Sequence, residues 1–179
     1  MGYLSLIYLC DFYNLPEVSK YWEGIIQINN WQKTRISRLI LEKLFGTLNG
    51  KKIAILGFAF KANTNDTRES PSIYICKDLI EEGAELYIHD PKVNPIQIDK
   101  EFEELSIKKN KKEKFKWQFS NHIDDALKDC HAVLIMTEWG EYTRIDWSEK
   151  EELMLKPAWL FDARLVANTN SLNKTNINY

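Results

Sequence analysis

The sequence is poor in the residues that build covalent or metal-bound scaffolds, with three cysteines and three histidines among 179 residues. Cys10, Cys76 and Cys130 are odd in number and form no C-x-x-C pair, so neither a disulfide framework nor a zinc site is expected. The histidines are scattered along the chain and give no support to another metal centre. Reduced thiols in a cytoplasmic protein are therefore the expected state.

A strong excess of one charge and a long hydrophobic run are also lacking. The formal net charge is −2, which gives no overall reason to expect nucleic acid as a partner. The opening MGYLSLIYLC is apolar but short, has no basic residue and leads directly into Asp11, so we predict neither a signal peptide nor a membrane span. The basic run at 108–116 lies between two expected sheet elements and is interpreted as a solvated insertion.

A long helix is the first element that the sequence predicts. In NLPEV, Asn14 is placed to cap a helix and Pro16 falls in its first turn; apolar residues then recur at helical spacing as far as Gly46. About thirty helical residues span ~45 Å, more than a small domain needs. Trp22 and Trp31 widen the apolar surface beyond one face, which favours a helix between layers or subunits. An ordinary amphipathic helix on its own domain is the alternative.

From residue 51 the pattern changes to strands that alternate with helices. Continuous apolar runs predict buried parallel strands, and Ser70, Pro71 and Gly83 mark the start and end of the first intervening helix. Strands are expected over 51–58, 85–91, 116–120, 131–139 and 158–164, and helices over 70–84, 94–106, 122–130 and 148–156. This order predicts a Rossmann-like α/β fold, an open, mostly parallel sheet with helices on both faces. The Asn-rich end, 168–179, is expected to be a mobile or loosely docked tail.

Charged side chains follow three of the predicted strands. Lys61 and Arg68 come after the first strand, Asp90 after the second, and Asp162 and Arg164 after the last. Because the carboxyl ends of parallel strands meet at one edge, where open α/β sheets bind ligands, these side chains should share a rim. Two cations near a helix N-terminus suit an anionic group and predict a nucleotide- or phosphate-binding domain.

The same loop has a purely structural interpretation. Arg68 could pair with Asp66 or Glu69, and Lys61 could simply be solvated. A lone Gly57 without G-x-G-x-x-G is weak evidence for a dinucleotide. Residue pattern alone leaves these alternatives open.

A more specific signal comes from motifs taken together. The segment GFAFKANTNDTRES, with TEW and FDAR later in the chain, resembles the carboxyl-terminal UDP-binding domain of the UDP-glucose 6-dehydrogenases, within the UDP-glucose/GDP-mannose dehydrogenase family. YLCDFYNLPEVSKYW resembles the start of that family's long central helix. The resemblance divides the chain into a dimerisation helix region (1–48), a UDP-sugar-binding α/β domain (49–167) and the tail (168–179). It implies a homodimer through the long helix, with higher oligomers open.

The resemblance also implies an activity and its binding residues. The family oxidises UDP-glucose to UDP-glucuronate with two NAD. Phe60 and Lys61 match the pair that touches the nucleotide sugar, Arg164 matches a substrate-contacting arginine, and Arg68 matches an arginine that reaches NAD. The glycine of the family's F-D-G-R is Ala163 here, which departs from the pattern.

No residue of this chain is assigned a catalytic role. The family's thiol nucleophile lies in a Gly-Gly-Ser-Cys-type segment before the stretch that matches IYLC, so Cys10 corresponds to a structural position. We therefore expect the 179-residue polypeptide alone not to turn over UDP-glucose. Two alternatives stay open: the same portion of a dehydrogenase for UDP-N-acetylmannosamine or GDP-mannose, and a non-catalytic dimerisation scaffold.

Overall fold

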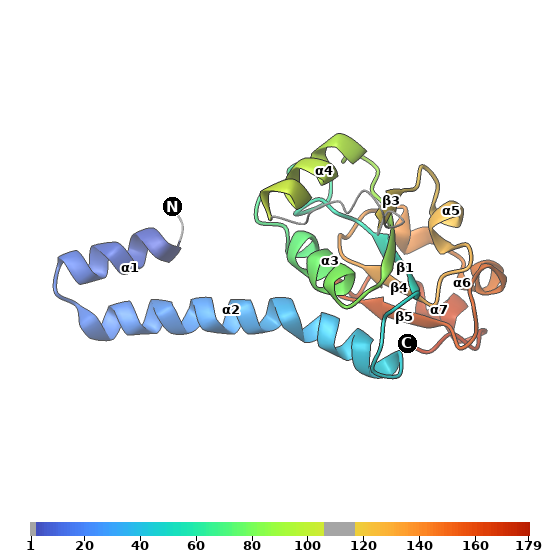
Figure 1. Cartoon of the computed structure of the whole chain (residues 1–179), viewed down its shortest axis with the longest axis horizontal. Coiled ribbons are helices and arrows are strands. Elements are labelled where there is room, and N and C mark those ends of the chain that lie inside the picture. Colours follow the sequence, from blue (N-terminus) through green and yellow to red (C-terminus); the bar gives the residue numbers. More distant parts are fainter. Residues whose placement is uncertain (1–2, 106–116) are drawn as a thin grey trace.

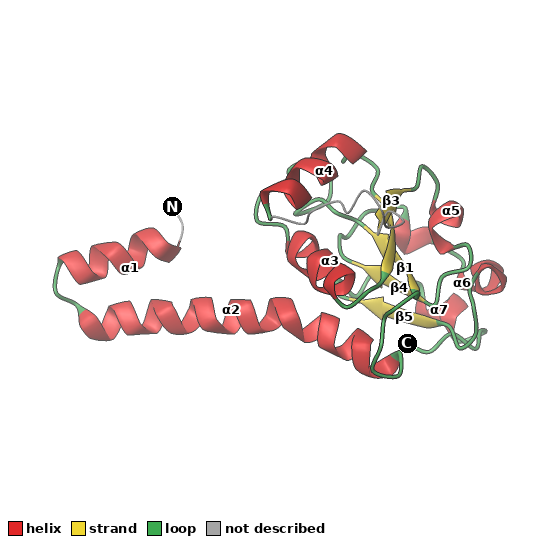
Figure 2. Cartoon of the chain, viewed as in Figure 1, coloured by secondary structure: helices red, strands yellow, loops and turns green. Residues whose placement is uncertain are grey.

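The computed structural model describes residues 3–105 and 117–179 (Figure 1). A helical hairpin projects from one side of an α/β domain, and Figure 2 shows the helices arranged around the sheet. The basic run at 108–116 lies outside the described residues. The strands are β1 (Lys52–Leu56), β2 (Glu85–His89), β3 (Trp117–Phe119), β4 (Ala132–Ile135) and β5 (Trp159–Asp162).

The five strands form one parallel sheet in the order β3-β2-β1-β4-β5. The central strands β1 and β4 are buried along almost their whole length, as continuous apolar runs require. Helices α3 (Pro71–Glu81) and α4 (Pro95–Glu104) lie on one side of the sheet, and α5 (Ile123–Leu127) and α6 (Trp147–Lys150) on the other (Figure 1). The predicted Rossmann-like fold with helices on both faces is confirmed.

Local signals fixed most of these elements. Ser70 caps α3 by accepting a hydrogen bond from the Ser72 N–H, and Pro71 is the first residue of the helix. Gly83 follows the helix end at φ +92°, a conformation that glycine adopts without strain. The helix expected over 148–156 is instead two short pieces, α6 and the 3₁₀ turn η2 (Glu151–Leu153).

The long helix is present as α2 (Pro16–Lys43), with one correction at its start. Leu15 occupies the N-cap position, and Asn14 has φ +53° in the preceding turn, so Asn14 does not cap the helix. That turn reverses the chain, and the short apolar helix α1 (Tyr3–Phe12) folds back beside α2 (Figure 1). The sequence pattern predicts a helix from Asn14 onward and the resemblance starts the long helix near Tyr8, so a separate helix before the turn is a correction to both.

Only the second half of α2 is anchored to the α/β domain. Ile40, Leu44 and Leu48 are almost fully buried in the domain core, and the Ser37 hydroxyl donates to Asp78 Oδ2 of α3 at 3.0 Å. The first half extends beyond the domain together with α1 (Figure 1). Large apolar side chains therefore remain exposed on this hairpin, Tyr21 and Trp31 among them.

The end of the chain is packed, contrary to the expected mobile or loosely docked tail. After the short helix α7 (Thr169–Leu172), Asn178 lies beside Trp159 of β5 in a parallel bridge. The Leu160 N–H donates to Asn178 O (2.8 Å) and the Asn178 N–H to Ala158 O (2.9 Å). Leu172 and Ile177 are buried, so two apolar residues and backbone pairing suffice to dock a mostly polar segment.

Candidate functional site

A cleft of about 1120 Å³ opens between helix α2 and the carboxyl edge of the sheet. Asn29, Asn30 and Arg35 line it from α2, and Phe60 and Arg164 line it from the loops after β1 and β5. The cleft therefore lies where open parallel sheets bind ligands, and its volume suits a ligand larger than a single phosphate.

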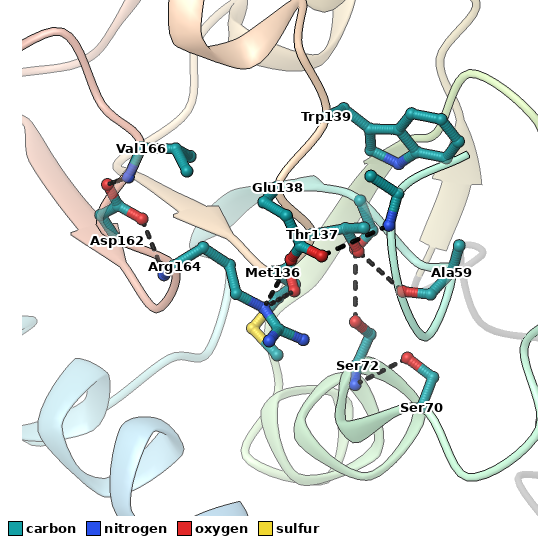
Figure 3. A network of polar contacts seen from close by, with 12 residues as sticks. Ala59, Ser70, Ser72, Met136, Thr137, Glu138, Trp139, Asp162, Arg164 and Val166 are labelled. Atoms are coloured by element: carbon teal, nitrogen blue, oxygen red, sulfur yellow. Dashed lines mark hydrogen bonds and ion pairs between the residues drawn. The ribbon is translucent and has the colours of Figure 1, made fainter. Parts of the chain in front are cut away.

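The exit from β1 requires a glycine. Gly57 has φ +98°, and a Cβ at this position would lie 2.5 Å from Thr137 Cβ and 2.8 Å from Thr137 N. The loops after β1 and β4 approach so closely that there is no space for a side chain. The Thr137 hydroxyl uses this proximity to donate to Ala59 O at 2.7 Å, which joins the two loops (Figure 3).

Asp90, at the end of β2, holds the same loops by accepting five hydrogen bonds. Its Oδ2 accepts from the Phe58 N–H (2.8 Å), the Ala59 N–H (3.0 Å) and Trp139 Nε1 (3.2 Å). Its Oδ1 accepts from the two backbone N–H groups at positions 92 and 93, both at 2.9 Å. The side chain is 4% exposed, so this buried carboxylate has a structural role.

The loop after β5 is organised by Asp162 in a similar way. Its two oxygens accept from the backbone N–H groups of Arg164 (2.8 Å), Val166 (2.7 Å) and Ala167 (2.7 Å) (Figure 3). The turn carries Leu165 at φ +56° with its side chain 87% exposed. The carboxylate thus fixes the backbone that presents the Arg164 side chain.

The Arg164 side chain is held by its Nε edge. Nε donates to Met136 O at 2.7 Å and lies 3.5 Å from Glu138 Oε2 (Figure 3). Glu138 Oε1 in turn accepts a long hydrogen bond, 3.5 Å, from the Ala62 N–H. Through this carboxylate the loop that carries Phe60 and Lys61 is linked to the loop that carries Arg164.

Arg68 pairs with Asp66, which is one of the two structural alternatives that the sequence left open. Its Nε and Nη2 donate to the two Asp66 oxygens at 2.9 and 2.7 Å, a bidentate pair. These hydrogen bonds lower the pKa of Asp66 to about 2. The Arg68 side chain is nevertheless 86% exposed, so the guanidinium is accessible while its direction is set by Asp66.

The structure brings some of the predicted binding residues together and leaves others apart. Phe60 and Arg164 line the cleft, and Phe60 is 47% exposed. Lys61, next in the chain, is exposed, and neither Lys61 nor Arg68 lines the cleft. Of the four, two therefore share the cleft and two lie on the surface beside it.

Sequence reasoning assigned no role to Glu138, Thr137 or the polar residues of α2. Thr137 and Glu138 belong to TEW, at the carboxyl end of the strand expected over 131–139, and two polar residues at the end of a strongly apolar strand were the signal that could have identified them. Asn29, Asn30 and Arg35 interrupt the apolar pattern of α2, and the structure places this interruption against the cleft.

Two of the three thiols, those of Cys76 and Cys130, are buried and poorly suited to nucleophilic chemistry. Burial raises the pKa of the Cys76 thiol, and burial also raises the pKa of Cys130 to about 12. Over residues 3–105 and 117–179 no group of His, Cys, Asp and Glu side chains could hold a metal ion, and no helix there is long and apolar enough to span a bilayer.

Comparison with known proteins gives consistent matches. The family model described as "UDP-glucose/GDP-mannose dehydrogenase family, UDP binding domain" matches residues 54–169. The chain is 45% identical to UDP-glucose 6-dehydrogenase of Drosophila melanogaster over 96% of its own length and 36% of that protein, and 45% identical to the Bos taurus enzyme over 91% and 33%. It thus spans about a third of the length of these relatives.

A solved structure supports the fold independently. A UDP-glucose dehydrogenase from the archaeon Pyrobaculum islandicum superimposes with a TM-score of 0.72, covering 94% of this chain and 34% of that chain at 24% identity. At this identity the likeness concerns the fold, including the helix before the α/β domain. The sheet, the cleft at its carboxyl edge and the matched family model together are the basis for assigning a function.

Proposed function

Because the chain belongs to the UDP-glucose/GDP-mannose dehydrogenase family, we propose that it binds the UDP moiety of UDP-glucose as the carboxyl-terminal part of an NAD-dependent UDP-glucose 6-dehydrogenase. The observation that carries this proposal is the cleft at the carboxyl edge of the sheet, with Phe60 and Arg164 in its lining. The names of the relatives at 37–45% identity, all UDP-glucose 6-dehydrogenases, support UDP-glucose over other nucleotide sugars.

Arg164 is suited to the diphosphate. Its Nε is engaged by protein acceptors, and its two terminal nitrogens point away from Glu138 in Figure 3. Two charge-assisted hydrogen bonds from such a fork to phosphate oxygens would contribute about 1.5–3 kcal/mol each. Phe60 supplies an apolar surface in the same cleft, and the exposed Lys61, next in the chain, adds a positive charge outside the cleft lining.

Arg68 is proposed to contact NAD rather than the nucleotide sugar. The guanidinium is exposed, lies outside the cleft lining and is oriented by Asp66, which fits an anionic group approaching from another part of the enzyme. NAD supplies the hydride acceptor when it is bound. The role of Arg68 is to position its phosphate groups, and no residue of this chain is proposed to act on the transferred hydride.

The exposed helical hairpin is proposed to form a homodimer interface. Tyr21, Ile28 and Trp31 of α2 are each more than half exposed, next to equally exposed residues of α1. An apolar surface of this kind on a projecting helix favours association, and two copies paired along α2 would share an isologous interface. A cytoplasmic location belongs to the same proposal and is supported by the free thiols of Cys76 and Cys130.

Calorimetric titration of the 179-residue chain with UDP tests the binding function. We expect weak binding, about millimolar, since relatives extend well beyond the matched third. The substitution Arg164→Ala should weaken it about tenfold or more, because a charge-assisted contact is lost. Lys128→Ala removes an exposed cation at the C-cap of α5, before β4 begins, and should leave the heat unchanged.

Ligand choice and oligomeric state complete the test. UDP-glucose should compete with UDP, whereas GDP-mannose should compete at least tenfold less well; equal competition would favour the GDP-mannose alternative. Light scattering should give a dimer mass, and Trp31→Glu should shift the chain toward monomer. The control Ile96→Glu, equally drastic on the exposed side of α4, should not. A monomeric wild-type chain at all concentrations would remove the dimer proposal.

A further inference from the structure

Glu138 occupies a bridging place between the two loops that border the cleft. Its Oε2 lies 3.5 Å from Arg164 Nε, and its Oε1 accepts from the Ala62 N–H at 3.5 Å. The carboxylate is 41% exposed, so it is partly shielded from water but not sealed. It comes directly after Thr137, which is fully buried and fixed by its bond to Ala59 O. The chain is therefore anchored one residue before Glu138.

The contacts of Arg164 all lie on one edge of its guanidinium. Nε donates to Met136 O at 2.7 Å and lies 3.5 Å from Glu138 Oε2 (Figure 3). For the terminal nitrogens, no bond to a described residue is drawn in that view. A guanidinium gripped at Nε retains the planar pair of Nη donors, which is the fork that binds two oxygens of one phosphate.

We propose that Glu138 is a positioning residue for nucleotide-diphosphate binding: it holds Arg164 by the Nε edge and braces the Ala62 amide, so that the Nη fork stays directed at the cleft. This inference rests on the proposed function and extends it to a residue outside the four assigned to ligand contact. An arginine side chain loses much rotamer freedom when it is ordered, and a group that orders it in advance removes part of that cost from binding.

The Glu138 carboxylate could also oppose binding by repelling the diphosphate, and experiment can separate this repulsion from the positioning of Arg164. A negative charge near the diphosphate would repel it, and Glu138 could occupy Arg164 in place of a ligand. If repulsion dominated, removing the carboxylate would strengthen UDP binding. The positioning role instead depends on an Oε1 acceptor for the Ala62 N–H and on the negative charge of Oε2 beside Arg164 Nε, so an uncharged amide should keep the first contact and weaken the second.

The experiment is a calorimetric titration of the 179-residue chain with UDP in five forms: wild type, Glu138→Ala, Glu138→Gln, Arg164→Ala and the double variant Glu138→Ala/Arg164→Ala. Glu138→Ala should raise the Kd about five- to tenfold, the range expected when an exposed ion pair and one ordered side chain are lost. Glu138→Gln should raise the Kd less than Glu138→Ala does, by about two- to fivefold, because the amide oxygen can still accept from the Ala62 N–H while the charge beside Arg164 is lost.

The double variant distinguishes positioning from general damage. Since Glu138 acts through Arg164, its removal should cause no further loss once Arg164 is alanine. Glu103→Ala, an exposed carboxylate on α4, is the matched control and should bind as wild type does. Additive losses in the double variant, or a Glu138→Ala chain that binds UDP as tightly as wild type or more tightly, would overturn the inference.

A ligand-free measurement separates this inference from the proposed function. The Nε–H signal of Arg164 in a ¹⁵N correlation spectrum, identified by its absence in Arg164→Lys, should move or broaden in Glu138→Ala before any UDP is added. An unchanged signal would overturn the positioning role. A wild-type chain that binds no UDP would overturn the proposed function and this inference with it, whereas UDP binding that is sensitive to Arg164 but insensitive to Glu138 would overturn only the inference.

Discussion

The contact between Gly57 and Thr137 makes a sharp prediction about stability. In Gly57→Ala, the new Cβ would lie 2.5 Å from Thr137 Cβ and 2.6 Å from its Oγ1, distances that no real packing allows. The neighbour cannot rotate away easily, because the Thr137 backbone N is also only 2.8 Å from the new atom and its hydroxyl is bonded to Ala59 O. One of the two loops has to move.

The expected cost combines two effects. Placing a residue with a Cβ in left-handed backbone costs about 1–2 kcal/mol, and overpacking costs about 1–3 kcal/mol. Gly57→Ala should therefore lower the free energy of unfolding by about 2–5 kcal/mol. With a urea m-value of about 2 kcal/mol per molar, the unfolding midpoint should fall by about 1–2.5 M. Urea unfolding followed by tryptophan fluorescence and by circular dichroism measures this shift directly.

Gly140 supplies the matched control from the same region. A Cβ at Gly140 meets nothing within 4 Å, and its φ lies outside the left-handed range. Gly140→Ala should therefore stay within about 0.5 kcal/mol of wild type. If Gly57→Ala unfolded at the same urea concentration as Gly140→Ala, the close approach of the β1 and β4 loops, and with it the geometry of the cleft edge, would be wrong.

Three further perturbations test other parts of the structure. Asp90→Asn should lose about 2–4 kcal/mol in urea unfolding, because an amide nitrogen must face backbone N–H groups on one side; an unchanged midpoint would contradict the five-bond arrangement. In a carboxyl-carbon NMR titration, the pKa of Asp66 should rise from about 2 toward the usual carboxyl value in Arg68→Ala, without reaching it, because the backbone N–H of residue 68 still donates to Asp66 Oδ1. Since that folded-state pKa is depressed, the stabilising contribution of the pair is present above the usual carboxyl pKa and is lost as pH falls toward 2; a pKa that does not move would exclude the pairing. Truncation after Thr175 should cost about 2–4 kcal/mol, because the buried Ile177 and the backbone bonds to β5 disappear, and an equally stable truncated chain would show a free tail.

The fold was accessible from sequence because its signals are local. Buried parallel strands appear as continuous apolar runs, and the α3 helix is bounded by Ser70, Pro71 and Gly83, whose side-chain and backbone preferences act within a few residues. The docked end was missed for the opposite reason. The end is held by backbone hydrogen bonds to β5, and these depend on a distant strand rather than on the identity of the residues that make them.

The candidate site also has a part that sequence predicts and a part that it does not. Topology alone placed Lys61, Arg68 and Arg164 at the carboxyl edge of the sheet, since that follows from strand order. Which of them line the cleft depends on the direction of side chains in two loops, and sequence carries little information on that direction. The structure places Arg164 in the lining, and it turns Arg68 toward Asp66. Ligand contacts at these positions stay predictions for the titrations above.

A division of labour between charges explains why this edge suits an anion. The carboxylates of Asp90 and Asp162 accept eight hydrogen bonds between them, seven from backbone N–H groups of the surrounding loops and one from the Trp139 indole. These two acidic side chains at the strand ends therefore hold the loops in place, and their negative charge is stabilised by the N–H groups that donate to them. Two cations of the same edge keep donors that are not used within the described part of the chain. Lys61 is exposed, and the contacts of Arg164 are made at Nε. A diphosphate bound in the cleft, as proposed, would therefore meet the free terminal donors of Arg164, while the carboxylate oxygens of Asp90 and Asp162 already accept hydrogen bonds from the loops.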